Sequence, residues 1–92
     1  MSGRQEDLGK PLPTPNFAIL ASNLAAQAMI ELGEIPNPIT GQTERSLTRA
    51  KFTIDLLQIL RDKTRGNLAA EEDQFLERSL YELRMRYVRA SG

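Results

Sequence analysis

The chain has 92 residues, no cysteine and no histidine, and its twelve Lys and Arg side chains balance twelve Asp and Glu. The missing residue types exclude disulfides and the thiolate and imidazole ligands of common metal sites. The neutral balance removes any general attraction to nucleic acid or to an anionic membrane. A domain of this size buries only about 60% of its unfolded surface, so association between copies is the remaining source of stability.

The amino-terminal segment is polar and rich in proline, with prolines at 11, 13 and 15. Alternating prolines forbid a helix and favour an extended chain. We therefore predict a flexible, partly disordered arm over residues 1–15 and a single helical domain over residues 16–90. Charged residues interrupt the arm, so it does not resemble a secretory signal, and no apolar run is long enough to span a membrane. We expect a cytoplasmic protein without membrane association.

The first helix is predicted over residues 17–32, because Asn16 can cap its first turn and Gly33 can end it. Its few polar residues share one narrow stripe: Asn23, Gln27 and Glu31. We interpret this stripe as the solvent side. A helix that is apolar over the rest of its circumference is expected to be buried nearly all round. Leu20 and Leu24 are therefore candidates for contacts beyond the chain's own core.

The loop after this helix has a shape fixed by two X-Pro steps and a Thr-Gly pair. This candidate functional loop consists of Ile35, Pro36, Asn37, Pro38, Thr40 and Gly41. We expect Ile35 and Ile39 to pack it onto the helices. Two roles stay open for the loop. It can set the angle between the helices that flank it, or it can bind a partner, because rigid surface loops often carry function.

The second helix is predicted over residues 47–64, between a capping Ser46 and a terminating Gly66. Its apolar seam comprises Leu47, Ala50, Ile54 and Leu57. Leu56 and Leu60 lie beside that seam, and Phe52 and Ile59 lie at its other edge.

The third helix is predicted over residues 70–89, with acidic residues in its first turn and arginines in its last turns, as the helix dipole favours. It carries two apolar faces. The main seam comprises Leu76, Leu80, Leu83 and Tyr87, and the second face comprises Tyr81, Met85 and Val88. We therefore predict an all-α, three-helix hairpin or bundle with more apolar surface than a monomer comfortably exposes.

This surplus predicts a homo-oligomer, most simply a two-fold homodimer. The candidate interface comprises Leu20, Leu24, Tyr81, Met85 and Val88. No catalytic motif or phosphate-binding loop is present, and we expect no catalytic, cofactor-binding or metal-binding residues. The leading hypothesis is a non-enzymatic protein-interaction module whose protein partner the sequence does not identify.

A basic cluster on the last helix gives the alternative hypothesis, association with nucleic acid. The cluster comprises Arg78, Arg84, Arg86 and Arg89, with tyrosines interleaved. A simpler explanation is compensation of the helix dipole together with pairing to Glu82, which is four residues from both Arg78 and Arg86. We favour this second explanation.

Several short motifs follow one another along the chain in a distinctive order. They are Ile35-Pro36-Asn37-Pro38 with Thr40-Gly41, Thr53-Ile54-Asp55-Leu56-Leu57, Gly66-Asn67-Leu68, Glu71-Glu72, and Leu80-Tyr81-Glu82-Leu83-Arg84-Met85. With these motifs, residues 16–88 resemble the bacterial family called domain of unknown function 1844. The resemblance implies a short helical bacterial protein and no assigned activity.

One departure from the family pattern lies just before the third helix. Similar members have Thr-Pro before the Glu-Glu pair, whereas this chain has Ala69 and Ala70. An alanine side chain cannot accept a hydrogen bond from the free N–H groups of a first helical turn, which typically costs about 1 kcal/mol. We therefore expect Ala69→Thr to raise the melting temperature.

Overall fold

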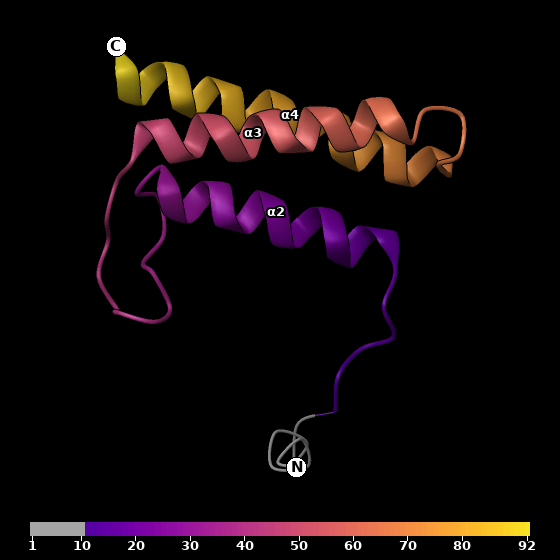
Figure 1. Cartoon of the computed structure of the whole chain (residues 1–92), viewed down its shortest axis with the longest axis horizontal. Coiled ribbons are helices and arrows are strands. Elements are labelled where there is room, and N and C mark those ends of the chain that lie inside the picture. The colour runs from indigo at the N-terminus through magenta and orange to yellow at the C-terminus, as the bar shows by residue number, and fades with distance from the viewer. Residues whose placement is uncertain (1–10) are drawn as a thin grey trace.

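The computed structural model describes residues 11–92, so most of the predicted arm, residues 1–10, lies outside the described residues. Within residues 11–92 the chain forms three α-helices and no strand: α2 (Phe17–Glu31), α3 (Leu47–Lys63) and α4 (Ala70–Ser91). The helices lie side by side, with α3 between the viewer and α4, and α2 along the edge of this pair (Figure 1). The predicted all-α, three-helix architecture is confirmed. Residues 11–15 are exposed and have no regular secondary structure.

The ends of α2 and α3 are set by the predicted capping chemistry. Asn16 Oδ1 accepts a hydrogen bond from the Ile19 N–H at 2.8 Å, and Ser46 Oγ accepts one from the Arg49 N–H at 3.3 Å. Gly33 follows α2 with a φ of +79°, a conformation that glycine adopts without steric cost. A Cβ at this position would lie 3.3 Å from Arg45 Cβ, so Gly33 also lets the loop just before α3 approach closely.

The start of α4 is only half capped. Ala69 is the N-cap residue, and its side chain makes no capping hydrogen bond. The Glu72 carboxylate supplies the other half of a capping box by accepting a hydrogen bond from the Ala69 N–H at 2.8 Å. The helix therefore begins where the sequence predicts, with one capping acceptor missing.

The core lies where the three helices meet, and all three contribute to it. Its buried apolar residues are Ala21, Ala28, Leu32, Ala50, Ile54, Leu57, Leu76, Leu80 and Leu83. The predicted main seams of α3 and α4 are confirmed, since their central residues belong to this set. Burying a leucine side chain contributes about 1.5–3 kcal/mol, whereas the three alanines contribute less and mainly allow the helix backbones to approach.

The expectation that the first helix is buried nearly all round is wrong. Only Ala21 and Ala28 of α2 are fully buried, and Leu20 is 49% exposed. Ala21 and Ala28 face the other two helices, whereas Ala18 and Ala26 are exposed. Because the described chain has no fourth helix to cover its outer side, that side remains in contact with solvent.

The loop between α2 and α3 is held by its own polar groups. Asn37 Oδ1 accepts a hydrogen bond from the Ile39 N–H at 2.8 Å, and the Gly41 N–H donates to the Asn37 carbonyl at 2.7 Å. Thr40 Oγ1 accepts from the Gln42 N–H at 3.2 Å. The expected anchoring by Ile39 is wrong, because this side chain is 90% exposed, whereas Ile35 is only 37% exposed. The loop extends beyond the ends of the helices (Figure 1), and Pro38 and Ile39 line an open hollow with Ile30 of α2.

Glu31 is not simply the end of a solvent stripe. Thr53, which is fully buried, donates its hydroxyl to Glu31 Oε1 at 2.6 Å. Gln27 Nε2 donates to the other carboxylate oxygen at 3.1 Å. The half-buried carboxylate therefore ties α2 to α3, and the solvent stripe is limited to the two exposed amides, Asn23 and Gln27.

Candidate interaction surfaces

The predicted second face of α4 is on the surface. Tyr81 and Val88 are 66% and 64% exposed, and Met85 is 43% exposed. Their spacing of four and three residues places them on one side of the helix, away from the buried leucines of the main seam. We call these three residues the α4 stripe. Val88 also lines a small hollow with Lys51 and Asp55, so the stripe borders α3.

A second outward-facing apolar set lies on α3. Phe52 is 65% exposed, and Ile59 and Leu56 are also exposed. We call these three residues the α3 stripe. Sequence reasoning placed them at the edges of the core seam and did not count them among the interface candidates. Their spacing of four and three residues, the same as in the α4 stripe, is the signal that identifies a separate helix face.

The two interface candidates on α2 differ in burial. Leu20 is about half exposed, whereas Leu24 is partly buried against the core. Leu24 therefore stabilises the chain's own bundle, and Leu20 is the α2 candidate that a second molecule can reach.

The four arginines of the predicted basic patch do not gather on one face. Arg84 points toward α3 and donates to Gln58 Oε1 at 2.8 Å. Arg86 points toward the end of α2, where it pairs with Glu34 at 2.8 Å and with Glu82 at 3.0 Å. The predicted pairing of Glu82 is thus formed with Arg86, within α4.

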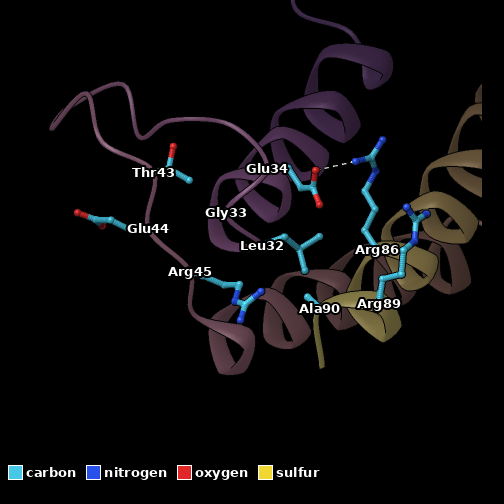
Figure 2. Close-up of a pocket in the computed structure, with 9 residues that line it drawn as sticks. All are labelled: Leu32, Gly33, Glu34, Thr43, Glu44, Arg45, Arg86, Arg89 and Ala90. Carbon is cyan, nitrogen blue, oxygen red and sulfur yellow. Dashed lines mark hydrogen bonds and ion pairs between the residues drawn. The ribbon is translucent and has the colours of Figure 1, made fainter. Parts of the chain in front are cut away.

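One open depression does collect basic side chains at the end of the bundle (Figure 2). It is lined by Arg45 from the loop just before α3 and by Arg86 and Arg89 from the end of α4. Its volume is about 510 Å³. Glu34 and Glu44 also line it, and the pair between Glu34 and Arg86 crosses its edge (Figure 2). The depression is therefore mixed in charge rather than purely cationic.

The exposed charges of α3 are arranged in local pairs. The hydrogen bond from Lys51 Nζ to Asp55, 2.9 Å long, raises the pKa of Lys51 above its ordinary value. Hydrogen bonds from Gln58 and Arg65 lower the pKa of Asp62. These pairs are on the surface, where each contributes little to stability.

No cluster of three or more carboxylates within residues 11–92 is placed to hold a metal ion. None of the helices in this range is long and apolar enough to cross a membrane. Every buried side-chain polar atom of the described chain has a hydrogen-bond partner. The α3 and α4 stripes are exposed apolar residues that the core of the chain does not bury.

Together the fold and the stripes define a small, all-helical chain with apolar faces directed outward. Residues 14–89 match the family described as "Domain of unknown function (DUF1844)". The match covers most of the chain, so the protein belongs to this family, and the resemblance seen in the sequence is confirmed. No curated protein and no solved structure matches the chain.

Proposed function

We propose that this protein is a non-enzymatic protein-interaction module that acts as a homo-oligomer, with a homodimer as the simplest form. One observation carries the proposal. Among residues 11–92, nine apolar residues are buried and three of these are alanines, whereas ten large apolar residues are exposed. A soluble chain that folds alone is expected to bury most of its large side chains and to expose few contiguous apolar patches.

The arrangement of the exposed residues supports association more than their number does. Single exposed apolar residues are normal on protein surfaces. Here six of the ten belong to the α3 and α4 stripes, each with helical spacing. Such stripes are typical of helix faces that pack against a second helix.

Light scattering combined with size-exclusion chromatography tests the proposal. At tens of micromolar protein, we expect a mass at least twice that of one chain. Met85→Lys and Phe52→Lys each place a charge in one stripe, so the variant that lowers the mass identifies the stripe that binds. Gln42→Lys is the matched control, because it adds the same charge at an exposed position outside both stripes. A wild-type mass of one chain at every concentration would rule out self-association.

A second candidate is association with nucleic acid, favoured by the three arginines around the depression in Figure 2. Glu34 and Glu44 offset part of this charge, and for that reason the candidate ranks second. Fluorescence anisotropy with labelled DNA and RNA at about 50 mM salt tests it. Binding that weakens with added salt and with Arg45→Ala and Arg89→Ala would support it, and no change in anisotropy at micromolar protein would exclude it.

A further inference from the structure

We propose that the depression shown in Figure 2 binds a segment of a partner protein through two separated carboxylates, one contacting Arg45 and the other contacting Arg89. This inference rests on the proposed role as a protein-interaction module and names a partner other than a second copy. The partner segment carries acidic side chains at two points and uncharged residues between them.

Arg45 is placed at one side of the depression by its contact with Gly33. A Cβ built on Gly33 would lie 3.3 Å from Arg45 Cβ and 3.7 Å from Arg45 Cδ. The aliphatic part of the Arg45 side chain therefore lies against Gly33, and the residue lines the depression. Packing of this stem reduces the side-chain freedom that is lost when the guanidinium binds a ligand.

The last turns of α4 supply the arginines of the opposite side, and these two side chains differ. Arg86 is only 28% exposed and pairs with Glu34 at 2.8 Å and with Glu82 at 3.0 Å. Its charge is therefore already compensated within the chain. Arg89 is exposed and lines the same depression, so it is the α4 arginine that a ligand can reach.

Two positive charges of the depression are left without a counterion inside the described chain. Among residues 11–92, no carboxylate forms an ion pair with Arg45 or Arg89. Of the two glutamates that line the depression, Glu34 is paired with Arg86, and the Glu44 carboxylate points away from the arginines (Figure 2). The uncompensated charge favours an anionic ligand.

The positions of these two arginines specify how the ligand's charges are distributed. Arg45 and Arg89 come from opposite sides of the depression, and Leu32 and Glu34 lie between them in Figure 2. An anionic group in the middle would approach the carboxylate of Glu34. A ligand that pairs with both arginines therefore carries an anionic group near each end and neutral groups between them.

An acidic peptide segment has this distribution of charge, and nucleic acid does not. A nucleic acid carries a negative charge at every nucleotide, so its phosphates would also approach Glu34. A peptide places carboxylates only where its sequence has Asp or Glu. Arginines recognise such carboxylates in many protein complexes, because the guanidinium can donate two parallel hydrogen bonds. The depression is also open and lined by charges, whereas sites for small molecules are concave and mostly apolar.

Titration of the full chain with synthetic peptides, followed by NMR of its backbone amides, tests the inference. The peptides carry two glutamates separated by serine spacers of increasing length. At one spacer length, we expect binding about fivefold tighter than that of a peptide of equal length with a single glutamate, because a second ion pair is formed. The amide signals of Arg45 and Arg89 should shift most.

Arginine truncation identifies the two contacts. Arg45→Ala and Arg89→Ala should each remove the advantage of the second glutamate, so that the best peptide binds no better than the single-glutamate peptide. Arg65→Ala is the matched control, because it removes an exposed arginine outside the depression. Circular dichroism and thermal melts establish that each variant is folded.

The outcomes separate this inference from the proposed self-association. Equal binding at every spacer length, or an equal loss with Arg65→Ala, would overturn the two-point contact. Single-stranded DNA that displaces the peptides and depends on the same arginines would assign the depression to nucleic acid instead. Met85→Lys lies outside the depression and should leave peptide binding unchanged. A monomeric wild type that still binds the peptides would remove the proposed homo-oligomer alone, and an oligomer that binds none of them would overturn this inference alone.

Discussion

The two sides of α4 carry similar residues at similar spacing and have opposite environments. On the inner side, Leu76, Leu80 and Leu83 are buried against α2 and α3. On the outer side, the α4 stripe is exposed to solvent. Helical periodicity alone does not distinguish the two sides, because each repeats at intervals of three and four residues. The difference is that the chain supplies packing partners for one side only.

This contrast separates two energetic roles of apolar residues. Inner residues stabilise the fold of one chain, whereas outer residues stabilise that fold only when a second molecule covers them. A substitution on the inner side should therefore change the stability of one chain, whereas a substitution on the outer side should change self-association.

The largest effect is expected from truncation on the inner side. Leu80→Ala creates a cavity among the buried leucines and should lower the free energy of unfolding by about 2–5 kcal/mol. Val88→Ala, on the outer side, should change it by less than about 0.5 kcal/mol when unfolding is measured at low protein concentration. Urea denaturation measures both. Equal losses for the two variants would show that the outer side is also part of the core of one chain.

The hydrogen bond between Thr53 and Glu31 tests the contact between α2 and α3. Thr53→Val keeps the shape of the side chain but removes the donor to a carboxylate, so the free energy of unfolding should fall by about 1.5–3 kcal/mol. Thr53→Ser retains the hydroxyl and serves as the control for the hydrogen bond. If the valine variant is as stable as the wild type, the carboxylate is satisfied by water instead.

The half-capped start of α4 offers a stabilising change. Ala69→Thr supplies the missing acceptor beside the existing hydrogen bond to Glu72, and should raise stability by about 1 kcal/mol. A thermal melt followed by circular dichroism measures the rise, with Ala69→Val as a control that adds bulk without an acceptor. A melting temperature at or below that of the wild type would contradict the capping geometry.

The loop after α2 has a smaller expected effect. Asn37→Ala removes the acceptor for the Ile39 N–H and should lower stability by about 0.5–1.5 kcal/mol. Such a loss supports a structural role for this side chain. Unchanged stability together with loss of a protein partner in an affinity pull-down would instead assign the loop to binding.

The smallest effect is expected from pH. Because the pKa of Asp62 is lowered below its ordinary value of 3.8, its stabilising contribution is present above that value and is lost as pH falls through the folded-state pKa. The pKa of Lys51 is raised above 10.5, so its contribution is lost as pH rises through the folded-state value. Asp62→Asn should make the stability decline less steep in acid. An unchanged acid profile would show that the contacts of Asp62 contribute nothing measurable.

The sequence predicts the helices well because their ends depend on local chemistry. Asn16, Ser46 and the glycines after α2 and α3 act within a few residues of their own positions. Burial depends on distant parts of the chain and is harder to predict. The apolar composition of α2 does not show that one side lacks a neighbour, and the sequence does not show that Thr53 approaches Glu31 across two helices.

Of the two exposed stripes, the sequence predicts only the one on α4. The α4 stripe could be found because its residues are distinct from a strong leucine seam on the same helix. The α3 stripe was missed because Phe52 and Ile59 lie close enough to the α3 seam to resemble its margin. Where two apolar faces are adjacent on one helix, only the positions of the neighbouring helices separate core from surface.

Sedimentation equilibrium of the wild-type chain, from micromolar to tens of micromolar, measures most directly whether the outer faces are covered by a second copy. Association through those faces predicts a weight-average mass that rises with concentration toward two chains, and a rise that Met85→Lys abolishes without unfolding the protein. A mass of one chain over the whole range would contradict it.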